Sequence, residues 1–172
     1  MQDILRQLAG GDLRSIGISD ELVKKILVKP LLFHKVFQGL YAPDPVIRMR
    51  AADVLEKASK NNPGLLKPHK TQIIALLQND KQQEVCWHMV QIVPRLDYTE
   101  AEEKKIYSAL KDYLSHKSKI VRSMAIEALG LMALKNPLLL NEVKKIIKKQ
   151  IVSTSPAVKA RAGKILIKLD AQ

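Results

Sequence analysis

The sequence predicts an all-α chain in which about four helical hairpins stack on one another, a right-handed α-solenoid with a helix capping its N-terminal end. An apolar β-branched residue recurs at intervals of 38, 36 and 37 residues, at Ile47, Val85, Val121 and Val158. Past the first of these anchors, one helix face of 3.6-residue period is formed by Ala51, Val54, Leu55 and Ala58. Aromatic residues make up 4% of the chain and glycines number seven, which favours helices over strands.

The N-terminal segment, residues 1–29, is predicted to cap the stack. A short helix is expected over residues 3–9, and Gly10-Gly11-Asp12 should end it. The loop that follows lacks the spacing and the lysine of a phosphate-binding loop. Ser19 is expected to cap the next helix, which runs to about residue 28 and covers the first hairpin.

The four hairpins are expected at about 30–63, 64–97, 98–136 and 137–170, within a single domain of residues 1–172. Helix starts are predicted at Pro30, Asp44-Pro45, Thr99-x-x-Glu102, Ser118 and Ser155-Pro156, because these residues cap a helix or suit its first position. Helices should end at Asn62-Pro63, Pro94 and Asn136-Pro137, because proline removes a backbone donor.

The apolar faces of the hairpins predict the core. First-helix residues expected inside are Leu32, Phe33, Val36, Phe37, Leu40, Ile73, Ile74, Leu77, Ile106, Leu110, Tyr113 and Leu114. On the second helices, a column of Ala51, Ala125 and Ala162, with Met89 in the second copy, would let helix axes approach closely. An isolated helix of this length is marginal in water, so the hairpins must bury these faces against one another.

The second helix of the first hairpin resembles that of a HEAT repeat. Residues 44–55 read DPVIRMRAADVL, with Arg48 after the anchor, and Ile120-Val121-Arg122 repeats this signature. The second copy departs from it with Cys86 in place of the arginine, and the fourth departs with Lys159. The chain is also similar to short bacterial HEAT-repeat proteins. The resemblance implies an armadillo-like solenoid with a binding role, in which the two signature arginines bridge to acids of the next repeat.

The chain is strongly basic, with 29 lysines and arginines against 17 acids and a formal net charge of +12. Such an excess favours contact with nucleic acid or with an acidic protein. The single cysteine, Cys86, excludes an internal disulfide framework and fits a reducing compartment. We see no secretory signal and no apolar stretch near the roughly 18 residues that span a bilayer, so a cytoplasmic protein without membrane contact is expected.

The second helices are predicted to line a concave wall, where solenoids usually bind partners. Counting 100° per residue from each anchor gives as candidate partner-binding residues Arg50, Lys57, Trp87, His88, Gln91, Arg161 and Lys164. Two interpretations of Trp87 stay open: it packs against a neighbouring segment, or it is an exposed platform for a peptide side chain or a base. Because Arg50 and Arg161 stand outside the HEAT signature, both are predicted to bind a ligand.

No catalytic, cofactor-binding or metal-binding residue is predicted. His88 has no second histidine at metal-ligand spacing, and Cys86 is expected to fill the core. Some HEAT-like folds remove damaged DNA bases with a tryptophan, a carboxylate and an arginine, roles that would fall here to Trp87, Asp53 or Glu127, and Arg50 or Arg161. The presence of one tryptophan in a short chain argues against that activity.

The leading interpretation is a non-enzymatic scaffold that binds a partner protein, and the alternative is a nucleic-acid-binding protein. Residues 138–169 hold eight lysines and arginines but one acid, Glu142. Lys144, Lys145, Lys148 and Lys149 fall on a first helix, which should lie on the convex side of the solenoid. Arg161 and Lys164 fall on a second helix. The basic residues are therefore expected to form two surfaces rather than one groove.

Overall fold

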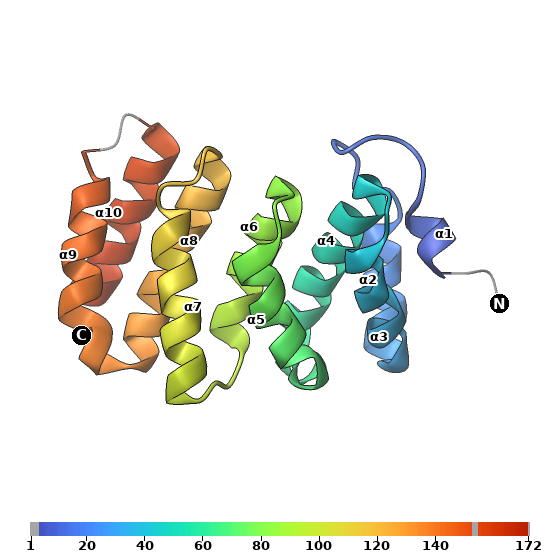
Figure 1. Cartoon of the computed structure of the whole chain (residues 1–172), viewed down its shortest axis with the longest axis horizontal. Coiled ribbons are helices and arrows are strands. Elements are labelled where there is room, and N and C mark those ends of the chain that lie inside the picture. The colour runs from blue at the N-terminus through green and yellow to red at the C-terminus, as the bar shows by residue number, and fades with distance from the viewer. Residues whose placement is uncertain (1–3, 153–154, 172) are drawn as a thin grey trace. The chain divides into compact units, whose positions relative to one another are not determined.

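The computed structural model describes residues 4–152 and 155–171, and every regular element within those ranges is helical (Figure 1). The all-α class is therefore confirmed. The chain divides into two compact units, Met1–Asp97 and Tyr98–Gln172, each with its own packed helices. A single domain over residues 1–172 stays a prediction.

Unit 1, Met1–Asp97, is built around helix α4 (Pro45–Asn61), which packs against α2 (Ser19–Val28), α3 (Leu31–Phe37) and α6 (Gln83–Ile92). Its other elements are α1 (Ile4–Leu8), η1 (Gln38–Tyr41), η2 (Pro63–His69), α5 (Lys70–Asn79) and η3 (Val93–Arg95), where η marks a 3-10 helix. Because α2 packs on α4, the predicted N-terminal cap over the first hairpin is confirmed.

Unit 2, Tyr98–Gln172, contains two hairpins. The first consists of α7 (Glu100–Tyr113) and α8 (Lys119–Lys135), and the second of α9 (Leu140–Gln150) and α10 (Pro156–Asp170), preceded by η4 (Pro137–Leu139). Helix α8 packs against both α7 and α10, so it occupies the centre of this unit as α4 does in unit 1.

Most helix ends follow the predicted capping chemistry. The Asp44 carboxylate accepts a hydrogen bond from the Val46 amide at 2.8 Å. The Thr99 hydroxyl accepts from the Glu102 amide at 3.3 Å, while the Glu102 carboxylate accepts from the Thr99 amide at 2.8 Å, which completes the predicted capping box. The prediction for Ser19 is wrong. Its hydroxyl donates to the Ile16 carbonyl at 2.6 Å, and Ile18 occupies the N-cap.

The predicted repeat anchors mark the core. Val85, Val121 and Val158 are fully buried, whereas Ile47 is half-buried. The small-residue column is also fully buried, at Ala51, Ala125 and Ala162. The first-helix residues expected inside are buried, except that three are half-buried: Leu32, Tyr113 and Leu114.

Two glycines mark where elements approach most closely. A Cβ added to Gly130 of α8 would lie less than 3.0 Å from the Cγ2 methyl of Ile165 in α10. A Cβ added to Gly39 of η1 would lie 2.9 Å from the Cβ of Ala51 in α4. Small residues at these positions therefore set the spacing between packed elements.

Both signature arginines are structural, as the resemblance implied, but their described acceptors are uncharged. Arg48 donates from Nε to the Gln82 side chain at 2.7 Å, and from Nη1 to the carbonyls of Ala42 and Pro43, each at 2.8 Å. Arg122 donates to the His116 carbonyl at 2.7 Å. The expected bridge to an acid is replaced by hydrogen bonds to carbonyls of the loop before each helix and, for Arg48, by a bond to the Gln82 side chain at the N-cap of α6.

Candidate functional site

Trp87 lies on the solvent-facing stripe of α6. Glu84, Trp87 and Gln91 share this side of the helix and are all half-buried, while Val85 and Met89 on the opposite side are fully buried. The Trp87 ring contacts the neighbouring imidazole of His88, with ring centroids 5.5 Å apart and planes inclined at 59°. Part of the indole is thus available at the surface, although Trp87 is less exposed than a free-standing platform would be.

The expectation that His88 lies on the exposed wall is wrong. His88 is only 7% exposed, because one residue beyond Trp87 the helix turns its side chain toward the charged side chains of α4. Burial lowers the pKa of His88 to about 4, partly offset by the negative charge of Glu56. Within the described residues its Nδ1 atom has no hydrogen-bond partner. His88 is therefore a neutral packing residue near pH 7.

Arg50, predicted to bind a ligand, is instead a buried structural residue. It is 4% exposed and donates to the Leu8 carbonyl at 2.9 Å, the Ala9 carbonyl at 3.1 Å and the Ser15 carbonyl at 2.9 Å. The first two carbonyls belong to the end of α1, where the helix dipole is negative and favours a cation. The guanidinium is therefore occupied by the N-terminal loop.

The backbone of that loop is shaped around Arg50. Gly11 and Gly17 have φ angles of 75° and 56°, and a Cβ at either position would approach the guanidinium to about 3.0 Å. Only glycine combines this left-handed conformation with so close an approach. The glycine-containing loop between α1 and α2 therefore covers a buried charge.

Lys57 of α4 makes two ion pairs, one to Asp20 of α2 and one to Asp53 of its own helix. Its Nζ atom lies 2.6 Å from the carboxylate of Asp20 and 2.9 Å from that of Asp53. Burial opposes the charge on Lys57, but the hydrogen bonds and charges of both aspartates outweigh it and raise the lysine pKa. With its side chain 32% exposed, Lys57 remains accessible at one edge.

In unit 2, Arg161 and Lys164 differ in their ion pairing and in their exposure to solvent. Arg161 of α10 makes an ion pair with Glu127 of α8, and each side chain is about one-third exposed. Lys164, one turn further along α10, is exposed. The structure thus brings Arg161 into an interhelical bridge and leaves Lys164 on the surface.

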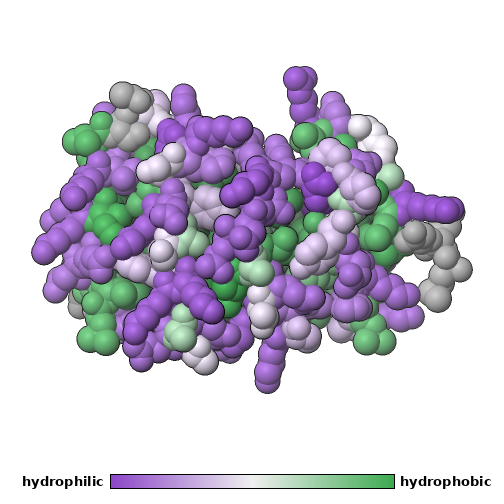
Figure 2. Space-filling model, viewed as in Figure 1, coloured by the Kyte–Doolittle hydropathy of each residue, from purple (hydrophilic) through white to green (hydrophobic). Residues whose placement is uncertain are grey.

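The lysines of α9 and α10 are mostly solvent-facing. Lys144 pairs with Asp170 at 3.0 Å, whereas the exposed ones are Lys145, Lys148, Lys149, Lys159, Lys164 and Lys168. On the face shown in Figure 2, hydrophilic side chains cover most of the surface. The exposed lysines therefore lie on both helices of the second hairpin of unit 2, three on α9 and three on α10.

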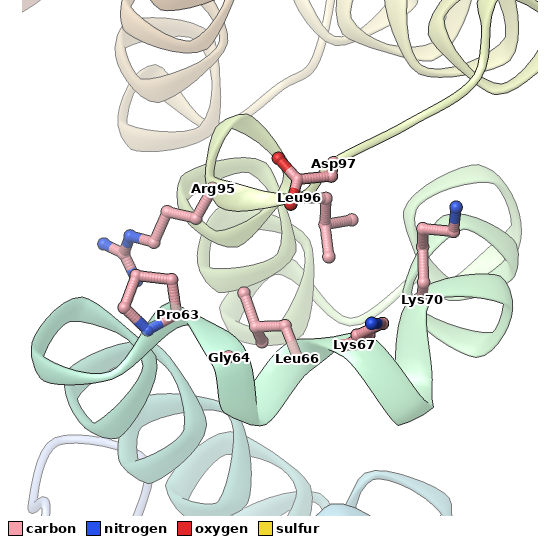
Figure 3. A pocket seen from close by; sticks show the side chains of 8 residues that line it. All are labelled: Pro63, Gly64, Leu66, Lys67, Lys70, Arg95, Leu96 and Asp97. Atoms are coloured by element: carbon pink, nitrogen blue, oxygen red, sulfur yellow. The ribbon is translucent and has the colours of Figure 1, made fainter.

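Unit 1 also contains a pocket that the sequence did not reveal. Its volume is about 370 Å³, and its lining residues are Pro63, Gly64, Leu66, Lys67, Lys70, Arg95, Leu96 and Asp97. Figure 3 shows Arg95 beside Pro63 on one side, and Lys67 and Lys70 on the other. The residues come from η2 with the start of α5, and from Arg95 at the end of η3 with the two residues after it, two segments that only the fold brings together.

The described residues hold no group of three or more histidine, cysteine or acidic side chains placed to bind a metal ion. Among their helices, none has both the length and the apolar character required to cross a membrane. Cys86 is buried, as expected for a core residue. Arg50 and Asp53, two residues of the base-excision alternative, are buried and engaged within unit 1.

Comparison with known proteins supports the fold alone. No protein-family model and no curated protein matches the sequence. Among solved structures, the chain is similar to the designed armadillo repeat protein YIII(Dq)4CqI, with a TM-score of 0.65 and 16% sequence identity over 96% of this chain and 80% of that one. The chain is an armadillo/HEAT-like α-solenoid.

Proposed function

We propose that this α-solenoid is a non-enzymatic adaptor that binds an acidic segment of a partner protein through the exposed stripes of its second helices. The observation that carries the proposal is the half-buried position of Trp87, the one tryptophan of the chain, on the solvent-facing stripe of α6. Tryptophan offers a large and rigid contact area, and it is enriched among residues that dominate binding energy. In solenoids the second helices usually form the concave binding surface.

The charge of the chain supports an acidic partner. The formal net charge is +12. Gln91 provides a hydrogen-bonding amide one helical turn after Trp87 on α6, and Lys57 on α4 is 32% exposed, with its charge paired to Asp20 and Asp53. A positive field accelerates encounter with an acidic segment and disfavours basic competitors. Of the residues first assigned to this surface, Arg50 and His88 are buried, so Lys57, Trp87 and Gln91 carry the proposal in unit 1.

The single tryptophan provides a direct test. A peptide of alternating glutamate and leucine, titrated into the protein at low salt, should change the Trp87 emission, while the matching glutamine and leucine peptide should not. With the peptide labelled instead, Trp87→Ala should weaken its binding by about tenfold or more, as expected for a dominant contact residue. Tyr41→Ala is the matched control, because Tyr41 is a 53% exposed aromatic on η1.

The same variants decide whether Trp87 is a binding residue or a packing residue. Thermal unfolding of Trp87→Ala should stay close to that of the unaltered protein. A loss of about 3–5 kcal/mol in unfolding free energy, the usual cost of removing a core tryptophan, would contradict the surface role. Unchanged peptide affinity in a stable Trp87→Ala protein would contradict the proposed function.

Nucleic-acid binding is the second candidate, favoured by the exposed lysines of α9 and α10. Polarisation of a labelled DNA should then show affinity that falls steeply with salt. Replacing Lys145, Lys148 and Lys149 together with glutamate should reduce the slope of log affinity against log salt by about 2–3. The control replaces the exposed Lys24, Lys25 and Lys29 of unit 1, which gives the same change in net charge. No binding at low salt would remove this candidate.

The cytoplasm is our proposed location. Cys86 is the single cysteine of the sequence and is buried, as suits a compartment that keeps thiols reduced. Fractionation of the native host cell tests this proposal, and recovery from an oxidising compartment would contradict it.

A further inference from the structure

The pocket of unit 1 carries an inference that rests on the proposed function and adds a specific contact to it. We infer that this pocket is a subsite for one carboxylate side chain of the acidic partner segment. Its volume of about 370 Å³ lies within the range of ligand-binding clefts, roughly 300–1,000 Å³. That space accommodates one or two amino-acid side chains rather than a helix.

The pocket has a rigid apolar floor. Leu66 and Leu96 line it but are only 1% and 3% exposed, so the surrounding core fixes both side chains. Pro63 forms part of the wall, and its ring restricts the backbone at the start of η2. A floor of this kind favours the methylene stem of a glutamate or an aliphatic neighbour over a fully polar ligand.

Arg95 is held in one orientation on one side of the pocket. Its Nη1 atom donates to the Glu56 carbonyl at 2.8 Å and to the Ser59 hydroxyl at 2.9 Å, and its Nη2 atom pairs with the Glu56 carboxylate. A guanidinium has five N–H donors, so these three hydrogen bonds leave two donors beyond those described. A side chain already fixed by its neighbours loses little entropy when it binds a ligand.

The charges around the pocket favour a single negative charge. The charged side chains that line it are three cations, Lys67, Lys70 and Arg95, and one anion, Asp97, so that their formal charges sum to two positive charges. Glu56, the ion-pair partner of Arg95, reduces that excess to one. A carboxylate carries one negative charge and matches this excess, whereas a phosphate dianion would exceed it by one charge. Figure 3 shows Asp97 next to Leu96, at the edge of the pocket.

The test compares two lysines of unit 1 with the labelled glutamate and leucine peptide. Lys67→Glu should weaken peptide binding by about tenfold, because it reverses a charge at the pocket. Lys35→Glu, on the exposed side of α3 and outside the pocket, changes the net charge equally and should alter affinity by less than about twofold. In the unaltered protein, the peptide should also shift the NMR signals of the Arg95 Nε–H group and the Leu66 and Leu96 methyl groups.

The outcomes separate this inference from the proposed function. If Lys67→Glu and Lys35→Glu bind the peptide equally while Trp87→Ala binds it weakly, the pocket is not a subsite and the proposed function stands. If the unaltered protein does not bind the peptide at low salt, both fail. If a phosphoserine peptide of the same length binds more tightly than the glutamate peptide, through Lys67, the assignment to a carboxylate is overturned.

Discussion

Replacing Gly130 with alanine should destabilise the protein, although the same change usually stabilises a helix. In an exposed helix interior, glycine to alanine contributes about 1 kcal/mol of stability, because alanine restricts the unfolded chain and favours the helix. At Gly130 the added methyl group would lie under 3.0 Å from the Cγ2 atom of Ile165. Ordinary contacts between carbon atoms are about 3.5–4.0 Å, so α8 and α10 would have to move apart.

The structure indicates that the clash cannot be relieved cheaply. Ile165 is 2% exposed, and its Cγ2 methyl is attached directly to Cβ, so a β-branched side chain in a helix has little freedom to turn it away. Overpacking of this kind typically costs about 1–3 kcal/mol. Gly163 in α10 offers the matched control, since a Cβ there would have no neighbouring atom within 4 Å.

The difference between Gly130→Ala and Gly163→Ala isolates the packing cost, because the gain in helix propensity is common to both. We expect Gly163→Ala to be stabilised by up to about 1 kcal/mol, and Gly130→Ala to fall below it by about 1–3 kcal/mol. In a chain of this size that gap corresponds to roughly 2–12 °C in Tm, measured by far-UV circular dichroism.

A double-mutant cycle tests the assigned contact. Ile165→Ala alone should cost about 2–5 kcal/mol, but its cost should be smaller in a Gly130→Ala background, where the new methyl group fills part of the space. Equal Tm shifts for Gly130→Ala and Gly163→Ala would refute the close approach of α8 and α10. Additive effects of Gly130→Ala and Ile165→Ala would refute the role of Ile165.

Three further changes test other parts of the structure. Arg50→Met should lower the free energy of unfolding by about 3 kcal/mol, because it removes the charged donor to three loop carbonyls. The control Arg14→Met, at an exposed position, should change it by less than about 0.5 kcal/mol. Chemical denaturation measures both. Burial lowers the pKa of His88 to about 4, whereas the pKa of histidine in the unfolded chain is about 6.5. As the pH falls below about 6.5, the unfolded chain therefore binds a proton that the folded protein does not. The free energy of unfolding should be highest above about pH 6.5 and should fall by about 3 kcal/mol toward pH 4. His88→Met should remove that part of the pH dependence, and an unchanged profile would contradict the buried position. Ala125→Leu should cost about 1–3 kcal/mol by overpacking, whereas Ala157→Leu at an exposed position of α10 should not, in thermal unfolding.

The fold could be predicted from the sequence because its signals are local and repeated. The anchors recur at a nearly constant interval, and the caps at Asp44, Thr99 and Ser118 lie within a few residues of the amides that they accept from. Ser19 shows the limit of such signals. A hydroxyl next to a helix start has two available partners, and here it donates to the Ile16 carbonyl.

The candidate site was harder to predict because a helical wheel assumes one buried side. Helix α4 packs against α2, α3 and α6, and the N-terminal loop covers Arg50, so little of its circumference remains exposed. The glycines of that loop were a usable signal, since an irregular glycine-rich segment next to a helical repeat can cover a charge. The pocket combines residues 63–70 with residues 95–97, and no local pattern relates those two segments.

The buried contact of Arg50 has a consequence for how such a stack can be terminated. A short irregular stretch folded over one guanidinium covers part of α4, next to α2, which also packs on α4. Arg50 lies on α4, whereas the carbonyls that it binds belong to residues 8–15, so neither segment makes this contact alone. Grafting this N-terminal cap onto another repeat protein would therefore require the arginine together with the glycine-containing loop.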